Sequence, residues 1–262
     1  MGHVKGMPEG FLEGMPLVIA SNGRSAVPAR GEKVVSMAPN TASPRDRYRA
    51  QVRAEIKEHA WGQIAGAGAS ALSLNAIAKQ MGMSGPALYR YFSSRDELIT
   101  ELVTDAYRSL ADAFRTTASD GPDLAGLAHA MRRWALEYPQ RYFLIYGTPV
   151  PGYHAPDAVT TIAGDIMATL LDACTAEATE ATDATDADNT ADVGETAFDT
   201  HLAHHRQWAG GHPAPAPVLR RALTFWTRLH GVLSLELAGH FTGMGFDPAQ
   251  LFAAELDGLL GR

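Results

Sequence analysis

Cysteine is almost absent from this sequence, since Cys174 is the only one among 262 residues. A single cysteine excludes an internal disulfide and any zinc site built from cysteines, so we expect the chain to work in the cytoplasm. No run approaches the ~18 consecutive apolar residues of a membrane span. The apolar stretch 11–20 is interrupted by Glu13, Gly14 and Pro16, and it lacks the basic flank of a signal peptide. These absences predict a protein with no membrane partner.

The alternation of apolar and polar residues that is typical of strands is also missing. Hydrophobic residues nevertheless make up 46% of the chain, which is enough for one or two domains with a packed core. Apolar residues recur at helical spacing in stretches that glycine and proline interrupt, namely 45–117, 122–174, 218–241 and 247–260. We therefore predict an all-α fold.

Composition divides the chain into a tail and two domains. Residues 1–43 are rich in Gly, Pro, Ser and Ala without any period, so we expect a disordered N-terminal tail. Because Met37 shortly precedes the first helical pattern, we hypothesise that translation begins there. Residues 44–94 are expected to form the first folded domain and residues 95–262 the second. The second contains an acidic, low-complexity loop at about 176–217.

Basic residues are missing between Cys174 and Thr200, where the acidic residues account for the whole of the net charge of −7. Residues 45–98, in contrast, contain eight Lys or Arg against five Asp or Glu. A basic block in an otherwise acidic protein is typical of a nucleic-acid reader. The acidic segment has two interpretations: it is a solvated loop, or it repels DNA and so keeps non-specific binding low.

The basic block begins with a long amphipathic helix that glycines at 66 and 68 bring to an end. Its inner stripe consists of Val52, Ile56, Ala60 and Ile64. Ser73 is placed to cap a second helix, which stops at Gly82. Ser84 is placed to cap a third and very short helix, with Pro86 in the first turn, where a missing N–H costs nothing.

The third helix carries an apolar side and a polar side. Leu88 and Phe92 are expected to face inward, whereas the three residues between them, Tyr89, Arg90 and Tyr91, face wholly or partly outward. A serine pair followed by Glu97 then starts a fourth helix. Two short helices joined by a turn that contains glycine predict a helix-turn-helix motif.

The stretch 71–92, ALSLNAIAKQMGMSGPALYRYF, resembles the signature of the tetracycline-repressor (TetR) family DNA-binding domain. The stretch 226–240, WTRLHGVLSLELAGH, together with WALEYP at 134–139, is similar to a regulatory-domain subclass of that family with a Trp/His-Gly signature. The resemblance implies a homodimeric, ligand-responsive transcription factor, usually a repressor, that reads a double-stranded DNA operator. It implies no cofactor and no enzymatic activity.

The expected site chemistry is therefore DNA recognition. Ser73, Ser84 and Arg95 each stand at a helix start and are expected to position phosphates. The resemblance implies a backbone contact for Tyr89, and Arg90 can reach a guanine edge with two hydrogen bonds. The rest of the expected DNA-binding set consists of the small residues Gly85, Pro86 and Ala87, the partly outward Tyr91, and a basic minor-groove arm of Arg45, Arg47 and Arg49.

The second domain is expected to hold an effector pocket and the dimer interface. Aromatic residues on its helices are either core or pocket lining. The expected lining consists of Trp134, Tyr138, Tyr142, Tyr146, Trp226 and His230. The resemblance implies that the last two helices pair across a two-fold axis, and the apolar stripe of 218–241 suits that role. This stripe consists of Val218, Ala222, Phe225, Leu229, Val232, Leu233 and Leu237.

An effector that prefers a conformation with differently spaced recognition helices would draw the dimer away from DNA. The helix 95–117 joins both domains in the chain and is the expected lever. The alternative is a helical small-molecule-binding protein or enzyme that does not bind DNA, although no Ser/His/Asp set, carboxylate pair or phosphate loop supports catalysis. The helically spaced His201, His204 and His205, with His212 nearby, are either a metal site or a solvated loop, and we favour the loop.

Overall fold

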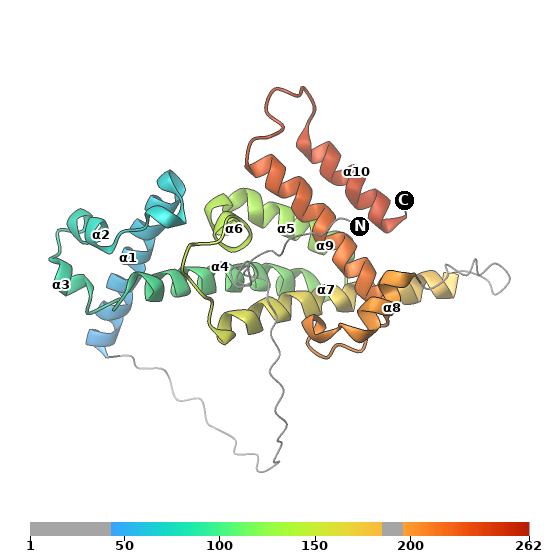
Figure 1. The fold of residues 1–262 in the computed structure, drawn as a ribbon, viewed down its shortest axis with the longest axis horizontal. Helices are drawn as coiled ribbons and strands as arrows, with labels where there is room; N and C mark the ends of the chain where they lie inside the picture. The colour runs from blue at the N-terminus through green and yellow to red at the C-terminus, as the bar shows by residue number, and fades with distance from the viewer. Residues whose placement is uncertain (1–42, 185–195, 262) are drawn as a thin grey trace, which may run out of the picture. The chain divides into compact units, whose positions relative to one another are not determined.

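The computed structural model describes residues 43–184 and 196–261, in which the regular structure is entirely helical (Figure 1). The helices are α1 (Pro44–Ala67), α2 (Leu74–Gln80), α3 (Gly85–Leu88), α4 (Arg95–Thr117), α5 (Leu124–Glu137), α6 (Pro139–Tyr146), α7 (Asp157–Ala184), α8 (Ala197–His204), α9 (Ala216–Leu237) and α10 (Pro248–Leu260). Short 3-10 turns lie at Ala69–Ala71, Ala118–Asp120 and Gln207–Ala209. The predicted all-α fold is confirmed. The tail prediction and the Met37 hypothesis lie outside the described residues, except at Ser43.

Contacts group the described chain into two compact units, residues 43–102 and residues 103–261. We call them the N-terminal unit and the C-terminal unit. The first turns of α4 belong with the N-terminal unit, because Leu98, Ile99 and Leu102 are fully buried there. A domain boundary is therefore better placed at 102/103 than at the 94/95 that the sequence suggested.

The N-terminal unit is built on α1, whose predicted inner stripe of Val52, Ile56, Ala60 and Ile64 is buried. Ser43 begins the helix, since its hydroxyl accepts a hydrogen bond from the Asp46 N–H at 3.2 Å. Gly68 ends it with a φ of +76°, which a residue with a Cβ rarely adopts. Both ends of α1 are thus fixed by local sequence.

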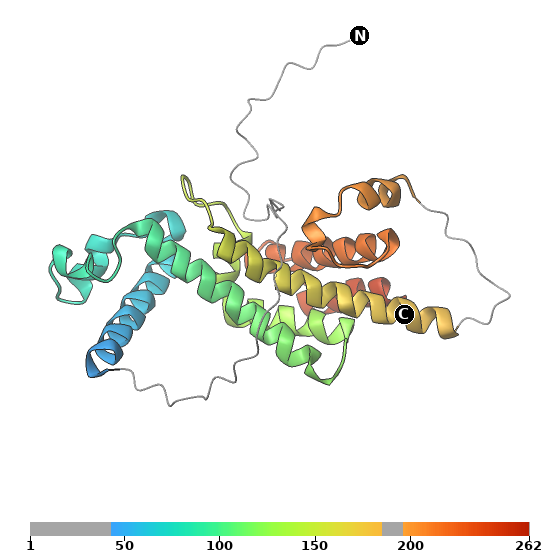
Figure 2. The same cartoon turned by 90° about the horizontal axis from the view of Figure 1, so that it is seen from below.

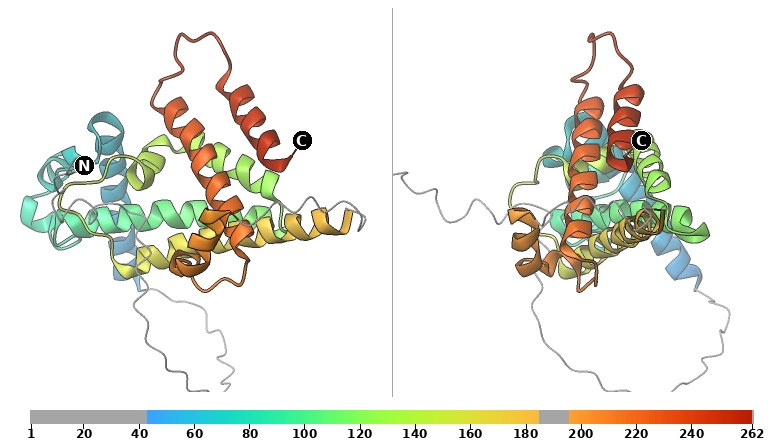
Figure 3. Two further views of the ribbon diagram at one scale, coloured as in Figure 1. Left: turned by 45° about the vertical axis from the view of Figure 1, so that its right-hand side comes forward. Right: turned by 90° about the vertical axis from the view of Figure 1, so that its right-hand side faces the viewer.

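The C-terminal unit is organised around α9, which packs against α5, α7, α8 and α10. Helices α9 and α10 lie side by side, and α9 crosses α7 (Figures 2 and 3). The predicted interface stripe of α9 is buried inside this single chain except for the half-buried Leu237; Ala222, Phe225, Leu229 and Leu233 are all 0% exposed. The prediction that this stripe forms the dimer interface is wrong, because the same apolar face fills the core of the unit.

The predicted acidic loop at 176–217 is also largely wrong. Helix α7 continues to Ala184, and α8 occupies part of the remainder, while 185–195 lie outside the described residues. Alanine and glutamate favour helix, and the Glu177 carboxylate pairs with Arg221 of α9 at 2.6 Å. The low-complexity composition therefore continues a packed helix here.

Helix α7 is long and apolar enough, over Asp157–Glu180, to cross a membrane by length and composition alone. Core helices of soluble proteins pass the same test. Leu170, Leu171 and Cys174 of α7 are 0% exposed, and the helix packs against α5 and α9. These contacts identify α7 as a core helix of the C-terminal unit.

Candidate nucleic-acid interface and ligand cavity

The helix-turn-helix consists of α2, a tight turn and α3. The Ser73 hydroxyl caps α2 by accepting a hydrogen bond from the Ala76 N–H at 3.3 Å, as predicted. Gly82 forms the turn with a φ of +65°, and the next amide, that of Met83, donates to the Ala78 carbonyl at 2.8 Å. A residue with a Cβ at position 82 would strain this turn, so the glycine sets the direction in which α3 leaves α2.

The segment 84–92 exposes the side that was predicted to contact DNA, although α3 itself ends at Leu88 and the predicted third helix continues only as a turn through 89–91. Leu88 and Phe92 are 0% exposed, which holds the segment in place. Tyr89 and Arg90 are exposed, as are Ser84 and Pro86, whereas Gly85, Ala87 and Tyr91 are half-buried. Ser84 occupies the cap position of α3, but its hydroxyl makes no cap hydrogen bond, so the predicted capping is wrong. That hydroxyl remains on the exposed surface.

Arginines of α1 hold the residues that follow α3. The Arg49 guanidinium donates to the Arg90 carbonyl at 3.0 Å and lies 5.6 Å from the Tyr91 ring centroid. The Arg53 guanidinium bonds the Tyr91 carbonyl and the Glu101 carboxylate, and it stacks over the Phe92 ring at 4.0 Å. Sequence reasoning missed Arg53, because its partners are distant in sequence. These contacts fix the backbone that carries Tyr89 and Arg90.

The predicted basic arm is not an extended segment. Arg45, Arg47 and Arg49 lie in the first two turns of α1, because the Ser43 cap starts the helix before them. Arg45 and Arg47 are exposed there, whereas Arg49 is engaged with Arg90. A helix end presents charge to a phosphate backbone, but it does not thread a minor groove as an arm does.

Arg95, predicted to bind phosphate, directs its donors at backbone carbonyls. Its Nε atom donates to the Leu72 carbonyl at 3.1 Å, and its Nη2 atom donates to the Ala69 and Ser70 carbonyls at 2.9 and 3.3 Å. These carbonyls lie directly before the Ser73 cap of α2. The structure thus gives Arg95 a positioning role, in which it ties the start of α4 to the start of α2.

Replacing Arg95 with alanine is expected to lower the free energy of unfolding of the N-terminal unit by about 1–2 kcal/mol, because carbonyls bonded to a charged group lose their donor. Chemical denaturation followed by circular dichroism measures this loss. Arg95→Lys is the matched control: an ammonium keeps the charge but cannot form the planar fork, so it should restore only part of the stability. If R95K were as stable as the unaltered protein, this would contradict the positioning role of the Arg95 guanidinium.

The predicted serine–glutamate start of α4 is confirmed. The Ser94 hydroxyl accepts from the Glu97 N–H at 3.0 Å, and the Glu97 carboxylate accepts from the Ser93 hydroxyl and N–H at 2.6 and 2.7 Å. The Ser93 hydroxyl is the main cause that lowers the pKa of Glu97, and Arg53 contributes as well. The carboxylate therefore stays ionised and keeps α4 capped.

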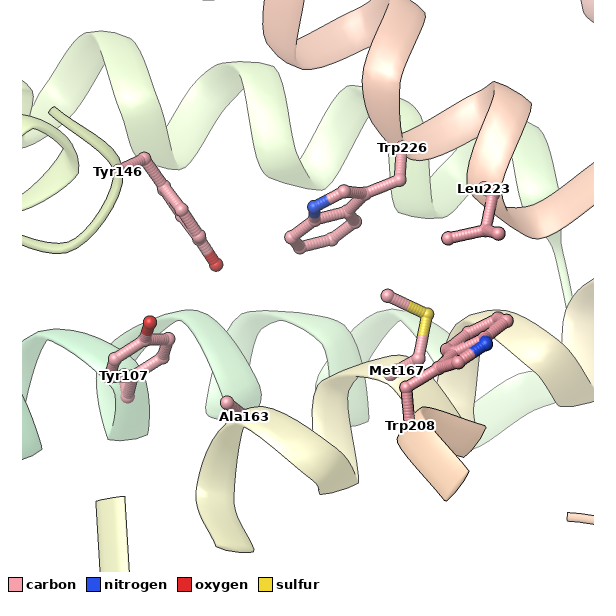
Figure 4. Close-up of a pocket in the computed structure, with 7 residues that line it drawn as sticks. All are labelled: Tyr107, Tyr146, Ala163, Met167, Trp208, Leu223 and Trp226. Atoms are coloured by element: carbon pink, nitrogen blue, oxygen red, sulfur yellow. The ribbon is translucent and has the colours of Figure 1, made fainter. Parts of the chain in front are cut away.

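The C-terminal unit encloses a cavity of about 260 Å³ (Figure 4). Its walls come from four helices and the short turn after α8. The lining residues are Tyr107, Tyr146, Ala163, Met167, Trp208, Leu223 and Trp226. A concave, largely aromatic lining is typical of a small-molecule site, and the volume lies just below the usual range for ligand pockets, which fits a small ligand.

Two of the predicted lining residues, Tyr146 and Trp226, form part of the cavity wall. Two others stand behind it: the His230 ring lies 4.4 Å from the Tyr146 ring and 4.3 Å from the Trp226 ring, and its Nδ1 atom is 2.9 Å from the Tyr142 hydroxyl. These four aromatic residues form one cluster. The geometry therefore brings most of the predicted ligand set together.

The remaining two predicted residues lie elsewhere. The Trp134 indole N–H donates to the Ser109 hydroxyl at 3.0 Å, and the Tyr138 ring stacks with the Arg141 guanidinium at 4.3 Å. Neither residue lines the cavity. Trp134 thus ties α5 to α4, and Tyr138 packs against residues of α5 and α6.

Sequence reasoning missed most of the cavity wall. Tyr107 belongs to the buried stripe of α4, a signal that was visible in the sequence. Met167 lies on α7 and Trp208 in the 3-10 turn after α8. Trp208 was hidden because the segment around it shows no helical period. Its half-buried position depends on contacts between this turn and α7.

His230 is expected to make the protein less stable as the pH falls below about 6.5. Burial lowers its pKa from 6.5 to about 3, so between these values the unfolded chain binds a proton that the folded chain excludes. The full stabilisation is therefore present above the unfolded pKa of 6.5. Below it, each further fall of one pH unit lowers the free energy of unfolding by up to about 1.4 kcal/mol. Urea titrations across this pH range measure the slope. His230→Gln should flatten it, and an unchanged slope in that variant would contradict the assignment.

The remaining sequence signals carry no site in the described chain. His201 and His204 lie on α8 and His205 directly follows it, so the expected loop is in fact a helix. Among the described residues no group of His, Cys, Asp and Glu is arranged to hold a metal ion. Cys174 is 0% exposed, and burial raises the pKa of its thiol to about 12, so the thiol stays protonated and unreactive.

Two family models match this chain. Residues 56–102 match the model described as bacterial regulatory proteins, tetR family, and residues 124–259 match the tetracyclin repressor-like C-terminal domain. Similar curated proteins include the HTH-type transcriptional regulators Mb1846 of Mycobacterium bovis and Rv1816 of Mycobacterium tuberculosis. Each is 37% identical over 215 residues, which cover 79% of this chain and 90% of the relative.

Two solved structures are similar as well. A protein described as regulatory, SCO4313, is 67% identical with a TM-score of 0.73, and the match covers 84% of this chain and 100% of that one. A protein of unknown function from Rhodococcus sp. RHA1 is 21% identical with a TM-score of 0.58, covering 86% of this chain and 98% of its own. The second likeness concerns the fold alone.

Proposed function

Since the chain belongs to the TetR family of DNA-binding transcriptional regulators, we propose that it is a homodimeric repressor which a small-molecule effector releases from its operator. Repression and effector release are typical of the family. The proposal places the protein in the cytoplasm with double-stranded DNA as its partner and with no cofactor. The activity of its curated relatives is transcriptional regulation, which favours this function over an enzyme with a helical bundle.

The exposed Tyr89 and Arg90, held between the buried Leu88 and Phe92, are the observation that carries the proposal. Because Leu88 and Phe92 are anchored in the core, the backbone between them is held in place. The Tyr89 phenol and the Arg90 guanidinium therefore project from a rigid backbone. Arg90 reads a guanine edge, and Tyr89 with Ser84 contacts phosphates. Gly85, Pro86 and Ala87 keep the approach to the major groove free of large side chains, and Tyr91 packs at the edge of the same surface.

The other predicted DNA-binding residues divide into contact and support. Arg45 and Arg47 are exposed on the first turns of α1 and contact phosphates in this proposal. Arg49, Ser73 and Arg95 make intramolecular hydrogen bonds that position the reading surface. Loss of a contact residue should make DNA affinity less dependent on salt, whereas loss of a supporting residue should not, because only residues that neutralise phosphates release counterions.

The dimer in this proposal forms through the outer face of α9 together with α10. Thr227, Gly231 and Leu235 recur at four-residue spacing on the exposed side of α9, and the Leu235 side chain is 44% exposed. A Cβ placed on Gly231 or on Gly258 of α10 would meet nothing within 4 Å. Glycine on an open helix face permits close approach of a second helix.

Effector release in this proposal is a population shift. A dimer reads two half-sites when its recognition helices lie ~34–36 Å apart. An effector that prefers another spacing must bind that state more tightly by about 5.5 kcal/mol to move the population from 99:1 to 1:99. Helix α4 is the lever, because it starts with Arg95 and carries Tyr107 of the cavity wall.

Fluorescence anisotropy with duplexes from the DNA beside the gene tests the function. The proposal predicts a preferred duplex, a steep loss of affinity with added salt, and release by extracts or compound libraries that contain the effector. Equal affinity for every duplex at moderate salt would contradict sequence-specific regulation. A sequence-specific complex that no compound weakens would contradict effector release alone.

A further inference from the structure

The cavity wall of the C-terminal unit contains no charged side chain. Four of its seven lining residues are aromatic, and the other three are Ala163, Met167 and Leu223. His230, which stands behind the wall, is neutral at physiological pH, because burial lowers its pKa to about 3. A charged ligand would lose its hydration here without gaining an opposite charge. The wall therefore favours a neutral occupant.

The shape of the cavity favours a flat molecule. Leu223 and Trp226 of α9 lie on one side, and Ala163, Met167 and Trp208 lie on the other (Figure 4). The Trp226 and Tyr146 rings meet edge to face, with centroids 5.7 Å apart and planes at 77°. A slot bounded by indole and phenol rings accepts a planar ring system, which can stack on one ring and meet the edge of another.

One polar group at the end of the slot is without a partner. Tyr107 is 1% exposed, and its hydroxyl makes no hydrogen bond. The hydroxyl lies on the side of Tyr107 that faces Tyr146, and the two rings meet edge to face with centroids 6.1 Å apart at this end of the cavity (Figure 4). Burial, together with Tyr153, raises the pKa of Tyr107 to about 12, so the hydroxyl keeps its proton and acts as a donor. A buried donor without an acceptor is costly, and a ligand oxygen would relieve that cost.

We propose that the cavity binds an uncharged, planar aromatic compound whose carbonyl oxygen accepts a hydrogen bond from the Tyr107 hydroxyl. This inference rests on the proposed function, because it names the chemical class of the effector. The ring system lies between Trp226 of α9 and Ala163 of α7, and the carbonyl points to the end formed by Tyr107 and Tyr146 (Figure 4).

Three bicyclic probes of similar size separate the features of this proposal. Coumarin is neutral and has a carbonyl, naphthalene is neutral without an acceptor, and coumarin-3-carboxylate is an anion. Equilibrium dialysis with the full-length protein, without DNA, is expected to rank coumarin first and the carboxylate last. Retention of the carboxylate as well as coumarin, or of none of the three, would overturn the proposal.

Variants of three residues then locate the probe. Tyr107→Phe removes only the donor, so it should weaken coumarin binding by roughly threefold to tenfold and leave naphthalene binding unchanged. Tyr138→Phe is the matched control, since it removes a phenol hydroxyl outside the cavity, and it should change neither. Ala163→Phe fills the slot and should abolish binding of both neutral probes. Full coumarin affinity in Y107F or in A163F would overturn the assignment.

The thermal stability of Y107F distinguishes the loss of a contact with the probe from a loss of folding. Because the Tyr107 hydroxyl has no partner in the free protein, its removal should leave the Tm unchanged or raise it. A large fall in Tm would show that the hydroxyl is satisfied within the protein, and this would overturn the proposal. Coumarin binding that leaves DNA affinity unchanged would instead contradict effector release, while the chemistry of the cavity would stand.

Discussion

Replacing Arg90 with glutamate is expected to lower the affinity for the operator by roughly 100-fold. A guanidinium that makes two hydrogen bonds to guanine is worth about 1–3 kcal/mol of discrimination, and a carboxylate at the same place also repels the phosphates. The loss should fall mainly on the specific complex, so the preference for the operator over random DNA should shrink as well. Fluorescence anisotropy with both duplexes at one salt concentration measures each effect.

The fold of the variant should be intact, because the Arg90 side chain is exposed and the hydrogen bonds of this residue come from its backbone. Its N–H donates to the Ala87 carbonyl, and its carbonyl accepts from Arg49. Arg115→Glu is the matched control: it makes the same change in charge on an exposed residue at the end of α4. This control should keep operator affinity within about twofold, apart from the screened effect of net charge. If R90E bound the operator with the same affinity as R115E, this would contradict a contact between Arg90 and DNA.

Replacing Leu229 with alanine is expected to lower the free energy of unfolding by about 2–5 kcal/mol. Leu229 is 0% exposed in the single chain, among α9 neighbours that are equally buried. Truncation removes apolar burial and leaves a cavity in a packed core, and both effects destabilise the fold. Chemical denaturation at several protein concentrations should give the same loss throughout, because the residue lies in the core of one chain.

Leu235→Ala is the matched control, because it makes the same truncation six residues later on the same helix, where the side chain is 44% exposed. Its effect on unfolding should stay within about 0.5 kcal/mol in dilute solution, and its main consequence should be weaker dimerisation. If the loss of unfolding free energy in Leu229→Ala depended on protein concentration, this would indicate that the apolar stripe of α9 forms the dimer interface after all.

The helix-turn-helix was predictable from sequence because its signals are local. Ser73 caps α2, Gly82 turns the chain, and Leu88 and Phe92 face inward, all within a short stretch. Caps and positive φ angles depend on neighbours three or four residues away, which a single sequence displays. The exposure of Tyr89 and Arg90 followed from the same periodicity.

The support of that surface was not predictable, because it depends on distant contacts. Arg95 bonds carbonyls 23 to 26 residues earlier, and Arg53 bonds residues 38 and 48 positions later. A sequence shows their charge but not their partners. Charge suggested phosphate binding for Arg95, whereas the structure directs it at the backbone.

The apolar stripe of α9 illustrates a different limit. An intramolecular core and a dimer interface both require apolar residues at helical spacing, so the pattern of Leu229 and its neighbours fits either. Only the packing of α5, α7, α8 and α10 around α9 decides between them. Trp208 was missed for a related reason, since a short turn acquires its role from the helix it packs against.

Hydroxyl-radical footprinting of the full-length protein on the DNA beside its gene would show at once whether the helix-turn-helix reads sequence. We expect two protected patches whose centres lie one helical turn apart, about 10 base pairs, and we expect both to be lost in Arg90→Glu. Uniform protection of operator and scrambled DNA, or protection that persists in R90E, would contradict recognition through α3.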